Sequence, residues 1–108
     1  MQNLLSKKCI PCEGGAMPLT TSEIEKYLPE ASDWIVLDQK KIQREFLFKD
    51  FKEAINFINK VADLAESEGH HPDIYLHSWN KVRIEISTHA IGGLSENDFI
   101  LAAKISAL

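Results

Sequence analysis

Apolar residues recur along this chain at two spacings, one typical of helices and the other typical of strands. Between residues 50 and 69 they recur every three or four positions, which predicts an amphipathic helix. Asp50 is suited to the N-cap of this helix, and Gly69 is suited to its C-terminal end. Between residues 82 and 88 apolar and polar side chains alternate, which predicts a strand with one buried face. The chain is therefore expected to combine helices with strands.

The rest of the pattern predicts two further helices and three further strands. Thr20 and Glu23 form a capping box at the start of the first helix, and Pro29 ends that helix. Ser95 is a second N-cap, and residues 99–105 carry the apolar face of the last helix. The expected helices cover residues 20–28, 50–69 and 95–105, and the expected strands cover residues 33–37, 41–48, 74–79 and 82–88.

The element order α-β-β-α-β-β-α predicts an α+β fold. Two hairpins, with turns at residues 38–40 and 80–81, can pair into one four-stranded antiparallel sheet with three helices packed on one face. The other face of the sheet is then expected to be more polar or to serve in assembly. One such domain accounts for all the periodic segments of the chain.

An N-terminal arm, residues 1–19, precedes the expected domain at residues 20–108. Gly14-Gly15 and Pro18 interrupt any regular spacing in this segment, and polar residues are frequent. We therefore expect the arm to be flexible, and its removal to change the fold little.

Cys9 and Cys12 form a C-x-x-C pair within the arm. Such a pair is half of many zinc sites and is also the motif of redox-active dithiols. The sequence holds no second pair, and no βαβ pattern surrounds this one. Two cysteines in a loose arm is the simplest interpretation, with metal binding and redox chemistry as the alternatives.

Length, composition and charge limit the class of protein. A chain of 108 residues suits one domain, and contents of 44% apolar and 26% charged residues are ordinary for a globular protein. A net charge of −4, with basic residues interleaved with acidic ones, argues against a nucleic-acid surface. Neither a membrane-spanning segment nor a secretory signal is recognisable, which favours the cytoplasm.

All four histidines lie within twenty residues of one another, and three of them, His70, His71 and His89, stand at the end of an expected element. Histidine titrates near neutral pH and is the side chain best suited to moving protons in a cell. Pro72 favours an extended backbone at His71, so His70 and His71 can contact different parts of a ligand. The pattern predicts acid–base chemistry on a small molecule. The full constellation consists of Glu66, His70, His71, Pro72, Trp79, His89 and Asp98.

Members of this constellation also have structural interpretations. Asp98 stands three residues after Ser95 and can complete a capping box there. Glu66 can be a solvated helix carboxylate, and Trp79 is more often a core residue than a ligand platform. Three histidines can bind zinc, but two adjacent ones in extended backbone do so poorly. His77 has no partner in the pattern and is interpreted as a surface or packing residue.

The constellation resembles the signature of the pterin-4a-carbinolamine dehydratases. In that family an acid, a His-His-Pro triplet, an aromatic residue, a histidine and an aspartate follow at fixed spacings. The corresponding residues here are Glu66, His70, His71, Pro72, Trp79, His89 and Asp98. The likeness covers about residues 20–105, and several matching positions at fixed spacing make it specific.

This resemblance implies a four-stranded sheet with helices on one side, assembled as a homodimer or homotetramer. It also implies the removal of water from 4a-hydroxytetrahydropterin, which aromatic amino acid hydroxylases release, to give quinonoid dihydropterin for recycling. This dehydration requires neither a metal nor a redox cofactor. By the resemblance, His70, His71 and His89 are the catalytic histidines, and the positions that line or support the pterin are Glu66, Pro72, Ser87, Thr88 and Asp98.

Two other functions stay open at this point. Animal members of the family also bind a homeodomain transcription factor, so a non-catalytic interaction protein is one alternative. Some bacterial relatives occur without an obvious hydroxylase, which leaves a molybdopterin-related role as another. The intact histidine trio favours the enzyme over the interaction protein. An aromatic amino acid hydroxylase in the same genome would favour recycling over both alternatives.

Overall fold

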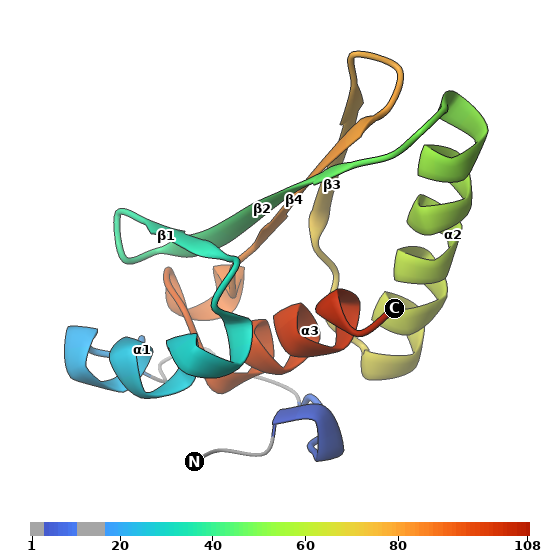
Figure 1. The fold of residues 1–108 in the computed structure, drawn as a ribbon. Coiled ribbons are helices and arrows are strands. Elements are labelled where there is room, and N and C mark those ends of the chain that lie inside the picture. Colours follow the sequence, from blue (N-terminus) through green and yellow to red (C-terminus); the bar gives the residue numbers. More distant parts are fainter. Residues whose placement is uncertain (1–3, 11–16) are drawn as a thin grey trace.

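The computed structural model of the protein describes residues 4–10 and 17–108, which form the α+β fold expected from the sequence (Figure 1). Its strands are β1 (Ile35–Leu37), β2 (Lys41–Leu47), β3 (Asp73–His77) and β4 (Lys81–Ile86), and the α-helices of the described residues are α1 (Thr21–Tyr27), α2 (Phe51–Glu68) and α3 (Glu96–Ser106). The hairpins β1–β2 and β3–β4 join through β2 and β4, which gives an antiparallel sheet of order β1-β2-β4-β3.

The core lies between the sheet and the three α-helices, which all cover the same face (Figure 1). In β4, Val82, Ile84 and Ile86 are completely buried, while the residues between them are partly exposed on the other face. This arrangement confirms the alternation predicted from the sequence. Phe99 of α3 is also completely buried and stacks on Tyr27 with ring centroids 5.5 Å apart. Burying such a side chain stabilises the fold by about 1.5–3 kcal/mol.

Both hairpins turn through two consecutive residues with positive φ. The first turn uses Asp38 and Gln39, with φ of 53° and 57°, at the expected place. The second uses Ser78 and Trp79, with φ of 50° and 57°, and lies two residues before the expected turn. Two positive φ values match the right-handed twist of the paired strands. Because Trp79 occupies the turn, it is 60% exposed, and the interpretation of Trp79 as a core residue is wrong.

The outer face of the sheet mixes ion pairs with exposed apolar side chains. Lys41 Nζ lies 2.9 Å from Glu85 Oε1 across the central strand pair. Lys41 is 42% exposed and Glu85 is 11% exposed, so the pair is only partly open to water. Three apolar side chains on this face are between 47% and 71% exposed, namely Ile35, Leu47 and Tyr75.

Local signals in the sequence set the helix ends. Thr20 and Glu23 form the expected capping box, with both reciprocal hydrogen bonds present. α1 ends at Tyr27, and the chain continues through Pro29 as a 3-10 helix, Leu28–Ala31, because proline fits the first turn of a new helix. Gly69 ends α2 in the left-handed conformation, with φ of 68°.

Residues 4–10 lie against α3 and belong to the core, which differs from the loose arm expected from the sequence. Leu4 is completely buried, and Cys9 is only 7% exposed. This difference has its origin in tertiary packing. α3 has buried residues on several sides, and residues 4–10 cover the side that faces away from the sheet. Cys12 and Gly14-Gly15, on which part of that expectation rested, lie outside the described residues.

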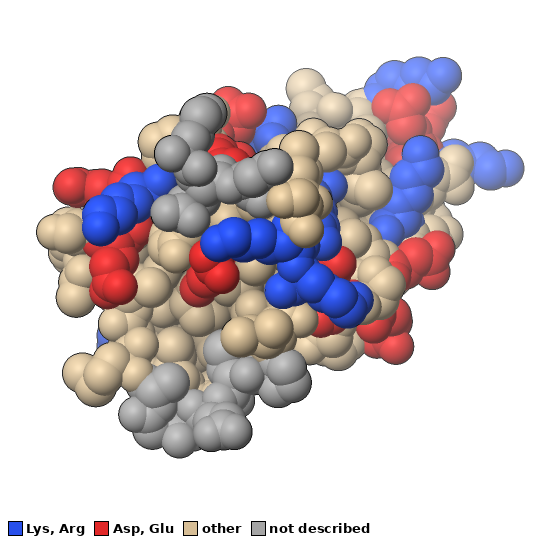
Figure 2. Space-filling view, turned by 90° about the horizontal axis from the view of Figure 1, so that it is seen from below, with Lys and Arg blue, Asp and Glu red and all other residues tan. Residues whose placement is uncertain are grey.

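On the face of the protein seen from below, neither positive nor negative side chains dominate. In Figure 2 the Lys and Arg side chains lie among Asp and Glu side chains over the described part of this face. Among the described residues, no helix has the length and apolar content needed to cross a bilayer.

Candidate active site

The candidate site is built around a short contact between His70 and Asp98. Gly69 ends α2, and its N–H and that of His70 both bond back to the carbonyl of Ala65, at 2.9 and 3.2 Å. The chain turns there toward the first turn of α3. His70 Nε2 lies 2.6 Å from Asp98 Oδ1, and the exposed fractions of the two side chains are 13% and 0%. Two residues 28 positions apart thus form one buried acid–imidazole pair.

Asp98 is held by the N-terminus of α3 as well as by the histidine. Its Oδ2 accepts hydrogen bonds from the Ser95 N–H at 2.8 Å and from Thr88 Oγ1 at 2.9 Å. The capping box that the sequence predicted between Ser95 and Asp98 is therefore present. Asp98 therefore has hydrogen-bond partners on both carboxylate oxygens, and it lies in the first turn of α3, at the positive end of the helix dipole.

This arrangement selects the proton positions on His70. Carboxylate oxygens accept hydrogen bonds, so in the contact with Asp98 Oδ1 the donor is the N–H at His70 Nε2. Nδ1 is then the ring nitrogen available for exchanging a proton with a ligand. A carboxylate that holds an imidazole in one tautomer is a common feature of acid–base sites.

His71 makes the corresponding pair on the surface. Its Nε2 lies 2.7 Å from Glu66 Oε1, and the exposed fractions of these side chains are 64% and 77%. The contrast with the buried His70 agrees with the expectation that the two adjacent histidines point in opposite directions. Because water screens the exposed pair, Glu66 orients His71 weakly.

His89 enters the site from a loop that the sequence did not predict as a helix. It begins a short 3-10 helix, His89–Ile91, which Gly92 ends with φ of 67°. The Thr88 N–H bonds to the carbonyl of Gly93 at 2.9 Å and closes the loop. A Cβ added at Gly93 would lie 2.8 Å from the Pro18 side chain, so the loop depends on glycine for its close packing.

The three histidines of the constellation line one open cavity of about 290 Å³. Ser87 and Thr88 line the same cavity. Asp98 lies behind this cavity and Glu66 beside it, and neither Pro72 nor Trp79 lines it. The complete lining is Gly69, His70, His71, Ser87, Thr88, His89 and Ala90.

A second cavity of about 390 Å³ adjoins the first and shares Ser87, Thr88 and His89 with it. The β1–β2 turn forms its other wall, with Asp38 and Lys40 among the lining residues. The sequence analysis did not identify these two residues, because nothing local to a hairpin turn indicates which distant loop it faces.

His77 lies outside the site, as predicted. Its Nε2 is 2.7 Å from Glu45 Oε1 on the outer face of the sheet. Within the described parts of the chain, no cluster of three or more His, Cys, Asp or Glu side chains is arranged to hold a metal ion.

The fold and the site together define an α+β protein with an open cavity lined by three histidines. The family model for pterin 4 alpha carbinolamine dehydratase matches residues 17–108. The chain therefore belongs to the pterin-4-alpha-carbinolamine dehydratase family, as the resemblance predicted.

Individual relatives agree with this membership. A protein from Alkaliphilus metalliredigens, named for this dehydratase, is 51% identical over 106 residues, which are 97% of this chain and 95% of its own. The mitochondrial pterin-4-alpha-carbinolamine dehydratase 2 of Arabidopsis thaliana is 46% identical and matches 100% of this chain and 60% of its own. The crystal structure of a transcriptional coactivator/pterin dehydratase from Brucella melitensis is similar with a TM-score of 0.77 and 35% identity. That match covers 83% of this chain and 96% of the other.

Proposed function

We propose that this protein is a hydro-lyase that removes water from pterin-4a-carbinolamine by histidine acid–base catalysis. Family membership supports the dehydratase activity. The observation that carries the mechanism is the cavity lined by His70, His71 and His89, in which a buried carboxylate holds one imidazole at 2.6 Å.

The proposed reaction needs two proton transfers. One proton goes to the 4a-hydroxyl group, which leaves as water when its bond to C4a breaks. Another leaves ring nitrogen N5, whose electron pair forms the new double bond to C4a. The products are water and quinonoid dihydropterin, so atoms and electrons balance without a redox partner. Two imidazoles in opposite protonation states supply both transfers, each worth ~10²–10⁴-fold in rate.

The residues take distinct parts in this proposal. His70 and His89 exchange protons with the substrate, and the exposed His71 both binds it and assists turnover. Ser87 and Thr88 supply polar contacts along the cavity wall. The remaining positions of the proposed site act through neighbours. Asp98 fixes His70, Glu66 orients His71, and Pro72 keeps the backbone extended at His71.

The direct test is the decay of the carbinolamine absorbance with and without the purified protein. We expect acceleration over buffer, because the cavity presents several imidazoles to one ligand. Treatment with EDTA should leave the rate unchanged, since only protons move. No acceleration over buffer would overturn the proposed function, and loss of activity on chelation would overturn its metal-free mechanism.

Within the cell, the proposed role is the recycling of tetrahydropterin released by aromatic amino acid hydroxylases.

A second candidate, an interaction protein, is favoured by one observation: the Brucella melitensis relative is named a transcriptional coactivator as well as a pterin dehydratase. A hydroxylase encoded in the same genome would support recycling. A cytoplasmic location stays a prediction from the sequence.

We also propose that the protein is a homodimer or homotetramer. The sheet leaves Ile35, Leu47 and Tyr75 exposed on its outer face, and Leu47 is 71% exposed. Exposed apolar side chains on the uncovered face of a sheet are a feature of assembly surfaces. Light scattering at micromolar concentration should therefore give a mass of at least two chains. A monomer mass would contradict this prediction without affecting the proposed chemistry.

A further inference from the structure

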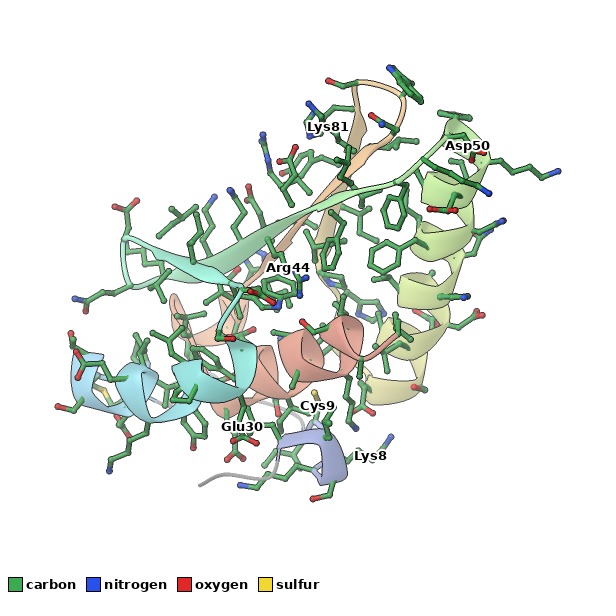
Figure 3. The ribbon with its side chains drawn as sticks, in the orientation of Figure 1. Lys8, Cys9, Glu30, Arg44, Asp50 and Lys81 are labelled. Atoms are coloured by element: carbon green, nitrogen blue, oxygen red, sulfur yellow. The ribbon has the colours of Figure 1, made fainter. Side chains whose placement is uncertain are left out.

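Residues 4–10, which we call the N-terminal strap, lie outside the residues matched by the family model and yet pack beside the proposed site's supports. The strap passes below α3 on the side away from the sheet, and Cys9 points up toward the helix (Figures 1 and 3). Leu4 is completely buried, and its N–H donates to Glu30 Oε1 at 3.0 Å. These contacts make the strap part of the folded domain.

The strap bonds to two consecutive residues in the first turn of α3, Glu96 and Asn97. Lys7 Nζ lies 2.7 Å from Glu96 Oε2, the same oxygen that accepts a hydrogen bond from the Tyr27 hydroxyl. The lysine hydrogen bond lowers the pKa of Glu96 against the opposing effect of burial, so the carboxylate is charged at neutral pH. The next residue, Asn97, is 4% exposed and uses both ends of its side-chain amide on the backbone of Ile10.

The third consecutive residue of that turn is Asp98, the partner of His70. Glu96, Asn97 and Asp98 thus connect the strap on one side of α3 with the buried imidazole on the other. Because a helix turn is rigid, the position of the Asp98 carboxylate follows the positions of its two neighbours.

The strap also forms hydrogen bonds with the end of α2, two residues before His70. The Cys9 N–H donates to Glu68 Oε1 at 2.9 Å, and Lys8 Nζ donates to the carbonyl of Ser67 at 2.7 Å. Glu68 Oε2 in turn lies 2.7 Å from Lys104 of α3. Glu68 stands two residues before His70, so the strap is bonded to both elements that supply the acid–imidazole pair.

Cys9 acts in the strap as a packing residue. Its thiol contacts the carbonyl of Asn97 at 3.5 Å. Burial, together with the nearby Glu68 carboxylate, raises the pKa of Cys9 to about 12. A thiol is reactive as its thiolate, so Cys9 is expected to be inert at neutral pH while the strap is docked.

We propose that the N-terminal strap is a positioning element of the dehydratase site, which holds Asp98 against His70 by bracing the first turn of α3 and the end of α2. The proposal rests on the proposed function for its effect on turnover, but the placement of Asp98 is testable without any activity. Misplacing a catalytic group by about 1 Å can cost ~10²-fold in rate, so loss of the brace should affect kcat more than KM.

The principal test variant is Asn97→Ala. It removes the two side-chain hydrogen bonds to the Ile10 backbone and retains the Asp98 residue itself. Its kcat should fall by ~10-fold to 10²-fold at nearly constant KM. A matched control is Val61→Ala, which removes a buried side chain of α2 far from the strap's contacts. At a similar loss of thermal stability, Val61→Ala should keep the wild-type kcat. Lys8→Ala, which contacts α2 alone, should give a smaller loss of kcat than Asn97→Ala.

Two readouts separate this proposal from the proposed function. The first is the downfield proton resonance of the His70–Asp98 hydrogen bond, assigned by its loss in His70→Ala. It should weaken in Asn97→Ala and persist in Val61→Ala. The second is alkylation of Cys9 in a Cys12→Ser background, which should be slow in the otherwise unchanged protein and faster with Asn97→Ala.

The outcomes are distinguishable. If Asn97→Ala speeds Cys9 alkylation but leaves both kcat and the resonance unchanged, the strap is released without consequence and the proposal is overturned. If the wild-type protein lacks dehydratase activity, the proposed function fails, while the resonance still decides whether the strap positions Asp98. If Val61→Ala loses the resonance to the same degree, general destabilisation explains the effect and the proposal is again overturned.

Discussion

Replacement of His70 by alanine is expected to lower kcat by ~10²-fold or more, the usual size of a general acid or base contribution. His70 is only 13% exposed and lies 2.6 Å from a completely buried carboxylate, so no other imidazole of the cavity has the same support. The fold should survive the change, because His70 follows the end of α2 and makes no strand pairing. Steady-state kinetics with a thermal melt of each variant would measure both effects.

The other histidines provide the comparison that makes this result interpretable. His89→Ala should also cost ~10²-fold, and the double variant with His70→Ala should cost less than the product of the single losses, because both act on one substrate. His71→Ala should have a mixed effect on KM and kcat. His77→Ala should change turnover little, since His77 pairs with Glu45 on the outer face of the sheet.

Equal and mild losses at His70, His77 and His89 would contradict the proposed mechanism. In that case the histidines would not act as one unit, and family membership would account for the fold without accounting for this cavity.

Replacement of Asp98 is expected to have the largest combined effect on stability and turnover. Asp98→Ala removes the carboxylate half of the capping box of α3, while the N-cap residue Ser95 stays. It also leaves the Ser95 N–H and the Thr88 hydroxyl without their carboxylate acceptor, at ~1–3 kcal/mol for a buried group left unsatisfied. These losses predict a fall of about 1–3 kcal/mol in the free energy of unfolding, with a fall in kcat similar to that of His70→Ala.

Asp98→Asn separates the two contributions. The amide keeps an oxygen that can cap α3, so its loss of stability should be smaller, at about 1 kcal/mol. It carries no charge, however, and cannot hold the His70 imidazole as an ionised carboxylate does, so kcat should still fall strongly. Chemical denaturation and kinetics on both variants would measure the split. If Asp98→Asn retains full turnover, the carboxylate serves only as a helix cap.

Alkaline conditions offer an independent check on the N-terminal part of the structure. Burial and hydrogen bonding to Glu96 raise the pKa of Tyr27 to about 12, as burial beside Glu68 does for Cys9. The unfolded chain releases these protons at lower pH than the folded protein does. Stability is therefore expected to be intact below about pH 9 and to fall as the pH rises toward 12. Denaturation midpoints of Tyr27→Phe and Cys9→Ala should show a weaker decline over this range.

Most of the fold could be predicted from the sequence because its signals are local. The helical spacing before Gly69, the capping boxes at Thr20 and Ser95, and the alternation along β4 each depend on neighbouring residues, and each is present in the structure. The histidine constellation could also be predicted, because its spacings resemble the signature of one family, and membership of that family is confirmed. Element ends were less accurate, as the turn at Ser78 and Trp79 shows.

Local patterns could not decide which surfaces meet. The spacing between Ser95 and Asp98 predicts the capping contact of Asp98 Oδ2. The contact of Asp98 Oδ1 with His70 depends instead on how α2 and α3 pack against each other. The second cavity beside His89 likewise requires the β1–β2 turn to face a loop some fifty residues further along the chain. Leu4 and Cys9 carry no periodic signal in so short a segment. The sequence by itself determined the elements, the family and the candidate histidines. Only tertiary packing decided that residues 4–10 cover α3, because their burial depends on the shape of surfaces that are distant in the sequence and that local spacing does not describe.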